Sequence, residues 1–203
     1  MKTNEGVRAT AAILAGGKSR RFGSDKTTLR WGEGTILEKI ARRCRCLFDE
    51  ILIVGNAPGK FSIPGAEEIE DIYADAGPLG GIHAALRRAA NDRVFVTACD
   101  MPFFDGALAA ALLECSRGHD VAVPREGVRL QPLFAVYNRT ALPEIERMLA
   151  EGERALRLLY GRVRVKCLDR DKWGAVERED RLFFNINFPE DYRAFVSNSK
   201  EPE

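Results

Sequence analysis

A glycine-rich, basic segment follows the first apolar run of the chain. The run covers residues 9–14, and Gly16 and Gly17 come almost directly after it. Four cations and one acid lie between Lys18 and Lys26, in a chain whose formal net charge is +1. Glycines after a strand let main-chain N–H groups approach an anion, and arginine and lysine side chains bind phosphate oxygens. The segment predicts a phosphate-binding loop, with a basic surface turn as the alternative. Its spacing is neither that of a Walker loop nor GxGxxG.

A carboxylate stands at the end of another apolar run. Residues 94–98 read VFVTA, and Cys99, Asp100 and Pro102 follow them. A carboxylate at the carboxyl end of a strand is well placed to bind a Mg²⁺ ion that bridges nucleotide phosphates. We therefore predict Asp100 as a metal ligand. The alternative is a capping role for the helix that begins near Asp105.

A third candidate combines two carboxylates with a helix start. Asp71 and Asp75 precede Gly77 and Pro78, and proline is favoured at the first position of a helix. The N-terminus of such a helix attracts anions. The pattern indicates either part of a nucleotide site or an acidic turn before a capped helix.

Two later segments carry amides. Gln131 opens the run QPLFAVY, which is also compatible with an ordinary strand, while Asn185 and Asn187 alternate along the chain. In an extended segment such alternation directs both amides to the same side.

These segments together resemble the nucleotidyltransferases of the molybdenum cofactor guanylyltransferase type. That family carries LAGGxxxRxGxDK, and Phe22 stands here where the family usually has methionine. GPLxGI after Gly77 and CDxPF around Asp100 also match, as does a late N-x-N-T-P-E-D in which Phe188 replaces threonine. The resemblance runs from residue 10 to about 195. The first motif matches at Leu14, Ala15, Gly16, Gly17, Arg21, Gly23, Asp25 and Lys26.

The resemblance implies a Mg²⁺-dependent enzyme that transfers GMP from GTP to the molybdenum–molybdopterin cofactor and releases pyrophosphate. It implies catalytic roles for Arg21, Lys26 and Asp100, with Asp100 also holding the metal. The acceptor would be bound by Gln131, Asn185 and Asn187, whose paired amides can read the polar edge of a pterin. The nucleotide would be bound by Leu14, Ala15, Gly16, Gly17, Lys26, Asn56, Asp71 and Asp100.

Two other functions stay open. A cytidylyltransferase or sugar-phosphate nucleotidyltransferase would use the same scaffold, because these residue types alone permit a pyrimidine. A non-catalytic nucleotide-binding regulator is disfavoured because Lys26 and Asp100 are both present. Fold analogy alone does not choose among them.

The elements that must position these residues alternate along the chain. Short apolar runs alternate with segments of helical periodicity, which predicts an α/β doubly wound, mostly parallel sheet of Rossmann-like nucleotidyltransferase type. In such sheets ligands bind beyond the carboxyl ends of the strands. After residue 124 the alternation loosens, which predicts a small antiparallel extension on the acceptor side. The strands are expected at residues 9–14, 51–54, 67–70, 94–98, 121–123, 133–137 and 163–168, and the helices at 36–48, 79–90, 108–115, 142–149, 155–160 and 189–195.

Length and composition set the remaining expectations. The 203 residues predict one nucleotidyltransferase domain over 1–203, with a nucleotide-binding half at about 9–124 and an acceptor-side half at about 125–196. Near-neutral charge argues against nucleic acid as a partner. The partners expected are GTP, the molybdopterin cofactor and, transiently, cofactor-supplying or molybdoenzyme-maturation proteins.

The cysteines and the N-terminus bear on the compartment. Five cysteines without C-x-x-C spacing predict reduced, mostly buried thiols, and Cys44 and Cys46 should point to different faces of their helix. The N-terminus lacks the apolar core of a signal peptide, and no apolar run reaches the roughly 20 residues of a membrane span. We expect a cytoplasmic protein without membrane contact.

Overall fold

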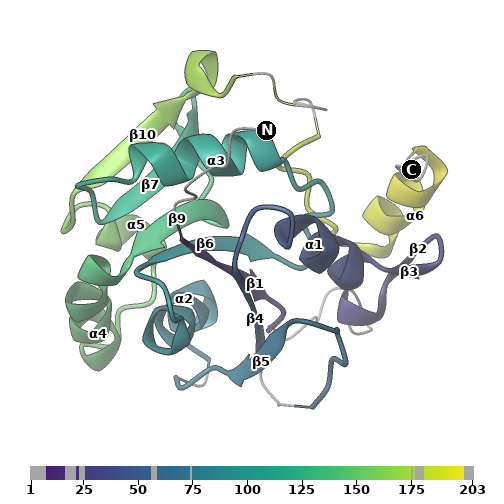
Figure 1. The fold of residues 1–203 in the computed structure, drawn as a ribbon, viewed down its shortest axis with the longest axis horizontal. Helices are drawn as coiled ribbons and strands as arrows, with labels where there is room; N and C mark the ends of the chain where they lie inside the picture. Colours follow the sequence, from purple (N-terminus) through teal and green to yellow (C-terminus); the bar gives the residue numbers. More distant parts are fainter. Residues whose placement is uncertain are drawn as a thin grey trace.

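One mixed sheet forms the centre of the protein, which we describe from a computed structural model. The structure describes residues 8–16, 22, 26–55, 59–73, 75–174, 176 and 181–198. The eight-stranded sheet has the order β10-β7-β9-β6-β1-β4-β5, and β8 pairs with β7 (Figure 1). Its strands are β1 (Thr10–Leu14), β4 (Glu50–Gly55), β5 (Glu67–Glu70), β6 (Arg93–Ala98), β7 (Val121–Glu126), β8 (Arg129–Leu130), β9 (Phe134–Asn138) and β10 (Val165–Asp169).

The strand β1 lies in the interior of the sheet, and every residue in it is buried. It pairs in parallel with β4 on one side and β6 on the other, with Leu14 opposite Val54 and Ala98. Parallel strands covered on both faces are expected to be continuously apolar. The prediction of a mostly parallel sheet is confirmed.

The loosened alternation after residue 124 marks an antiparallel insertion. The strand β9 lies between β6 and β7 and runs antiparallel to both, and β8 forms an antiparallel pair with β7. The strand β10 then pairs with β7 in parallel at the edge of the sheet. The predicted antiparallel extension is therefore part of the main sheet.

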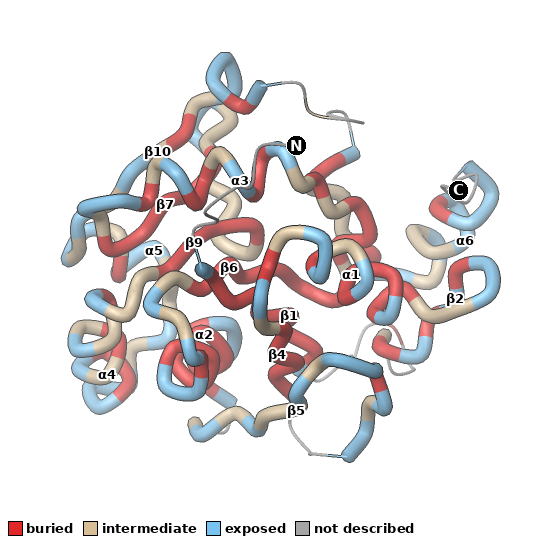
Figure 2. Tube along the Cα trace, viewed as in Figure 1, coloured by how far each residue is buried: buried red, intermediate tan, exposed pale blue. Residues whose placement is uncertain are grey.

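Helices cover both faces of the sheet, as a doubly wound fold requires. Buried side chains of α1, α3 and α6 pack in one core cluster, and those of α2, α4 and α5 pack in the other. Figure 2 shows buried segments along the central strands and on the inner sides of these helices. The helices are α1 (Ile36–Cys44), α2 (Gly77–Arg88), α3 (Gly106–Cys115), α4 (Leu142–Ala150), α5 (Leu156–Leu159) and α6 (Pro189–Asn198).

The helix α1 begins where its capping pattern predicts. The Thr35 side chain accepts from the Glu38 main-chain N–H at 3.1 Å, and Glu38 accepts from the Thr35 N–H at 2.6 Å. This reciprocal capping box satisfies two otherwise unpaired donors. The helix ends at Cys44, four residues earlier than the apolar spacing suggested.

An ion pair lies at the edge of the sheet that is opposite the carboxyl ends of the parallel strands. Asp120, just before β7, accepts from the Arg164 guanidinium at 2.9 and 3.1 Å and from the Thr140 hydroxyl at 2.6 Å. The Arg164 side chain holds the pKa of the Asp120 carboxyl well below its ordinary value. This contact ties the start of β10 to that of β7.

Three sequence expectations need correction. A two-stranded sheet of β2 (Arg30–Trp31) and β3 (Gly34–Thr35) was not predicted, because two-residue strands leave no periodic pattern. The thiols are not mostly buried: Cys44 and Cys99 are buried, Cys115 and Cys167 are partly buried, and Cys46 is exposed. Cys44 and Cys46 differ in exposure, but Cys46 lies beyond the end of α1, so the two thiols do not occupy two faces of one helix. Among the described residues no helix is both long and apolar enough to span a bilayer.

Candidate active site

A cleft of about 460 Å³ opens beyond the carboxyl ends of β1, β4 and β6. Because these strands are neighbours and parallel, the loops that follow them meet at one edge of the sheet. The N-terminus of α2 forms another wall, with Gly77 and Pro78 in the lining. Six residues predicted for the site line this cleft: Leu14, Ala15, Gly16, Lys26, Asp71 and Asp100.

Lys26 and Asp100 form an ion pair within the cleft. The Lys26 Nζ atom lies 2.9 Å from Asp100 Oδ2, although 74 residues separate the two in sequence. Lys26 begins the 3₁₀ helix η1 (Lys26–Thr28), and Asp100 follows the end of β6. The side chains are only 15% and 21% exposed, so the pair is shielded from solvent yet reachable from the cleft. The arrangement sets a cation and an anion where a charged ligand can compete for either.

The late amide segment reaches the same pair. Asn187 Oδ1 accepts from Lys26 Nζ at 3.2 Å. The Asn185 side-chain amide instead donates to the Phe183 carbonyl at 2.9 Å. The two amides therefore engage different partners, one in the cleft and one within its own segment. Their joint role in binding an acceptor stays a prediction.

The start of α6 is capped despite the phenylalanine at position 188. The main-chain N–H groups of Asn187 and Phe188 both donate to Asp191 Oδ2, at 2.9 and 2.8 Å. A carboxylate in the first turn of a helix satisfies free donors and favours the positive end of the dipole. The hydroxyl that the family motif places at 188 is thus not needed to begin this helix.

Asp71 is a half-buried carboxylate on the α2 side of the cleft. Its Oδ1 atom accepts from the Tyr73 main-chain N–H at 3.0 Å. A β-carbon on Gly80 would lie 2.8 Å from the same oxygen, so glycine allows α2 to pack closely against this carboxylate. Burial raises the pKa of Asp71, while the Tyr73 N–H and the nearby His83 oppose that rise.

The first turn after β1 is tightly integrated in the sheet. The Ala15 N–H donates to the Val54 carbonyl at 2.8 Å, and the Leu14 carbonyl accepts from the Cys99 N–H at 3.0 Å. These two main-chain groups, predicted to meet a base, are already bonded. Base reading at this turn would use the second lone pair of the Leu14 carbonyl or the carbonyl of Ala15.

Part of the basic loop lies outside the described residues. Gly17, Arg21, Gly23 and Asp25 fall there, as does Asn56 after β4. Their expected roles therefore stay predictions.

Within that loop Phe22 is described, and it is buried. Its ring meets that of Tyr192 on α6 edge to face, with centroids 6.4 Å apart. Tyr192 in turn donates its hydroxyl to the Arg30 carbonyl at 2.8 Å. The apolar residue of the motif thus attaches the loop to the last helix, which Figure 1 shows beside β2 and β3.

Gln131, predicted to bind the acceptor, lies in a turn before β9. Its N–H donates to the Pro124 carbonyl, and its own carbonyl accepts from the Phe134 N–H, both at 3.1 Å. Leu133, two residues later, lines the cleft. Sequence reasoning noted the run that contains Leu133 but chose Gln131 within it, and it missed Thr27, because an ordinary apolar or hydroxyl side chain does not stand out as a lining residue.

The described residues contain no group of three or more His, Cys, Asp or Glu side chains that could hold a metal ion. Asp100 lines the cleft at the end of β6, and the other two carboxylates of the lining, Asp71 and Asp75, precede α2 and form no such group with it. Mg²⁺ retains several waters and is commonly bound by one or two carboxylates together with substrate phosphates. A single carboxylate therefore fits a metal that arrives with a nucleotide better than one that resides in the protein.

Comparison with known proteins gives a consistent picture. Residues 11–165 match the family model described as MobA-like NTP transferase domain. A relative from Pelotomaculum thermopropionicum, described as a probable molybdenum cofactor guanylyltransferase, is 39% identical over 197 residues, covering 96% of each chain. The molybdenum cofactor guanylyltransferase of Desulfosudis oleivorans is 34% identical and covers 90% of this chain and 91% of its own.

Solved structures agree on the fold. The molybdopterin-guanine dinucleotide biosynthesis protein A of Archaeoglobus fulgidus superimposes with a TM-score of 0.80 at 27% identity, covering 93% of this chain and 97% of that one. A 2-C-methyl-D-erythritol 4-phosphate cytidylyltransferase from Thermus thermophilus superimposes with a TM-score of 0.66 at 19% identity, covering 92% and 96%. The second likeness shows a shared fold alone.

Proposed function

The chain belongs to the family of MobA-like NTP transferase domains, and on that premise we propose that it transfers GMP from GTP to the molybdenum–molybdopterin cofactor. The observation that carries the proposal is the 39% identity, over almost the whole chain, to a relative described as a probable molybdenum cofactor guanylyltransferase. The Lys26–Asp100 pair in the cleft supports it, because both charges suit a triphosphate.

In the proposed reaction a phosphate oxygen of the acceptor attacks the α-phosphorus of GTP. A new P–O bond forms there, the bond to the β-phosphate oxygen breaks, and pyrophosphate leaves with that electron pair. Both reactants are polyanions, so the protein must align them and neutralise charge rather than supply a nucleophile. Lys26 would serve this purpose, together with Arg21, Gly16 and Gly17.

Asp100 would hold Mg²⁺ when the nucleotide is bound. Bound there, the metal would supply positive charge to the phosphate oxygens. Lys26 must then exchange its contact with Asp100 for one with a phosphate. The 2.9 Å pair supports this role, because it keeps both side chains aimed at the cleft before the substrate enters.

The nucleoside would lie between the turn after β1 and the N-terminus of α2. Leu14, Ala15 and Asp71 line this part of the cleft, and Asn56 follows the neighbouring strand β4. An ionised Asp71 would accept hydrogen bonds from the N1 and N2 positions of guanine, a pair of donors that adenine lacks. A site built for that edge can reject a mismatched base by roughly 10⁴.

The acceptor would approach from the side of Gln131, Asn185 and Asn187. The contact of Asn187 with Lys26 supports this placement, because it brings the late segment beside the phosphate-binding lysine. We further propose that the chain works as one domain in the cytoplasm and receives its acceptor through transient contact with cofactor-supplying or maturation proteins.

A cytidylyltransferase on the same fold is the second candidate. The likeness to the Thermus thermophilus enzyme favours it only at the level of fold, at 19% identity. The relatives described as guanylyltransferases are considerably more similar, at 39% and 34% identity.

The test is pyrophosphate release with molybdenum–molybdopterin and each of the four nucleoside triphosphates, with and without Mg²⁺. We expect release with GTP and Mg²⁺ only. Lys26→Ala should reduce turnover or GTP affinity at least roughly tenfold, since a charge-assisted phosphate contact contributes about 1.5–3 kcal/mol. Arg42→Ala, on the exposed face of α1, is the matched control and should leave both unchanged. Preferential use of CTP would overturn the substrate, and an equal loss in both variants would overturn the role of Lys26.

A further inference from the structure

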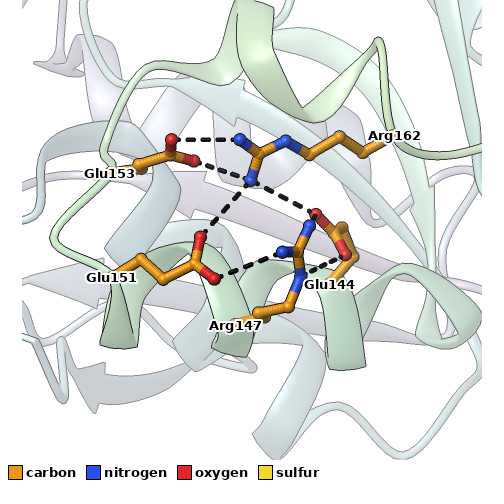
Figure 3. Close-up of polar contacts among 5 residues, drawn as sticks. All are labelled: Glu144, Arg147, Glu151, Glu153 and Arg162. Atoms are coloured by element: carbon orange, nitrogen blue, oxygen red, sulfur yellow. Dashed lines mark hydrogen bonds and ion pairs between the residues drawn. The ribbon is translucent and has the colours of Figure 1, made fainter.

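An ion-pair network fixes the connection between α4 and α5. Figure 3 shows Glu144 and Arg147 of α4 facing Glu151, Glu153 and Arg162 across this connection. Arg147 pairs with Glu144 at 2.6 Å and with Glu151 at 3.2 Å, and Arg162 pairs with Glu153 at 2.7 Å. Single exposed pairs contribute little, but a network that shares its members restrains the backbone that carries them.

The next residue in this connection reaches the candidate site. Arg154 directly follows Glu153 and donates from Nη1 to the main-chain carbonyl of Asp75 at 2.7 Å. The two residues are 79 positions apart in the sequence. A side chain from the predicted acceptor half therefore holds the backbone beside the nucleotide cleft.

The backbone that Arg154 contacts is conformationally unusual. We call Asp75, Ala76 and Gly77 the Asp75 turn. Asp75 has φ of +60°, which makes it the one non-glycine residue with positive φ in the described part of the chain, and Gly77 follows with φ of +63°. Such conformations persist where surrounding contacts hold them in place. Asp75 and Gly77 both line the cleft, and Gly77 begins α2.

From these contacts we propose that Arg154 is a positioning residue for nucleotide binding, acting through the carbonyl of Asp75. The network of Figure 3 holds the α4–α5 connection, Arg154 extends from it, and the Asp75 turn is thereby held in the shape that opens α2 toward the cleft. The proposal rests on the proposed function for its ligand, GTP. It adds that the acceptor-side half shapes the nucleotide side of the site.

The test compares Arg154→Ala with Arg157→Ala. Both arginines are exposed, and Arg157 lies three residues later on α5. Calorimetric titration with GTP and Mg²⁺ should show a dissociation constant raised about three- to tenfold in Arg154→Ala, because one hydrogen bond contributes about 0.5–1.5 kcal/mol. Arg157→Ala should match the parent protein. Arg154→Lys should recover part of the loss. The melting temperature should fall by a few degrees at most in Arg154→Ala, because one hydrogen bond is lost, and should match the parent protein in Arg157→Ala.

Hydrogen exchange gives a readout that needs no substrate. The Ala76 N–H donates to the Tyr73 carbonyl at 3.2 Å, and we expect it to exchange faster in Arg154→Ala but not in Arg157→Ala. Unchanged exchange and unchanged GTP affinity would overturn the proposal. A parent protein that binds no GTP, combined with faster exchange in Arg154→Ala, would overturn the proposed function and leave the positioning role standing.

Discussion

Removing the carboxylate of Asp100 should have opposite effects on GTP binding with and without metal. In the protein without ligands, Lys26 Nζ is bonded to Asp100 Oδ2 at 2.9 Å, so a nucleotide must compete for the lysine. The substitution Asp100→Asn removes that competition and also removes a negative charge facing the phosphates. Without metal, the variant should therefore bind GTP more tightly than the parent protein.

The size of this effect follows from the exposure of the pair. A hydrogen bond between charged groups contributes about 1.5–3 kcal/mol, and partial exposure favours the lower end of that range. Lys26 and Asp100 are 15% and 21% exposed, respectively. Roughly 1.4 kcal/mol corresponds to a factor of ten, so GTP affinity in EDTA should rise up to about tenfold.

The assay is calorimetric titration of GTP in EDTA and again in excess Mg²⁺. With Mg²⁺ the order should reverse, because the variant lacks the proposed metal ligand, and turnover by Asp100→Asn or Asp100→Ala should be lost. Asp92→Asn, an 85% exposed carboxylate at the opposite edge of the sheet, is the control and should match the parent in both buffers. Equal or weaker binding by Asp100→Asn in EDTA would refute the idea that Lys26 is held back by its partner.

Three further predictions concern stability, packing and the acceptor. Asp120→Asn should lower the free energy of unfolding at pH 7 by about 2–3 kcal/mol in urea titrations. Because the folded-state pKa of Asp120 is depressed, this difference should be full above pH 4 and vanish as the pH falls toward the folded-state pKa. Gly81→Ala would place a β-carbon 3.0 Å from a methyl group of Leu14 in β1, so it should weaken GTP binding and lower the free energy of unfolding by up to about 2 kcal/mol. Gly106→Ala makes only ordinary van der Waals contacts, so it should leave the free energy of unfolding unchanged or raise it. Asn187→Ala should impair binding of the acceptor more than binding of GTP in separate titrations, because the exposed hydrogen bond from Lys26 to Asn187 contributes little to holding the lysine. A loss of affinity confined to GTP would contradict this.

The fold was predictable where local pattern and topology agree. Continuous apolar runs bounded by glycine identified the buried parallel strands, and Thr35 with Glu38 marked the start of α1. The partner of β9 was not predictable, because a short apolar run carries no information on which strands will flank it. The insertion of β9 between β6 and β7 is decided by tertiary packing.

The site was predictable to the extent that strand ends converge. Lys26, Asp71 and Asp100 share a cleft because the parallel strands that precede them or lie beside them end at one edge. The contact of Arg154 with Asp75 left no signal, since it joins a lone arginine to a main-chain carbonyl 79 residues away. The alternation of Asn185 and Asn187 did not reveal that they have different partners, because the bond of the first amide to the Phe183 carbonyl is set by the local backbone.

The return of α6 to the beginning of the chain has a consequence for synthesis. The ring of Phe195 lies 4.8 Å from that of Trp31 between centroids, and Asn187 reaches Lys26. A nascent chain that has released its first hundred residues from the ribosome already carries β1, β4 and β6, yet it lacks the segment that covers Trp31 and bonds to the lysine. The surroundings of Lys26 are therefore completed only after residues 187–195 have been synthesised, so GTP should not find its finished site on a nascent chain that ends before them.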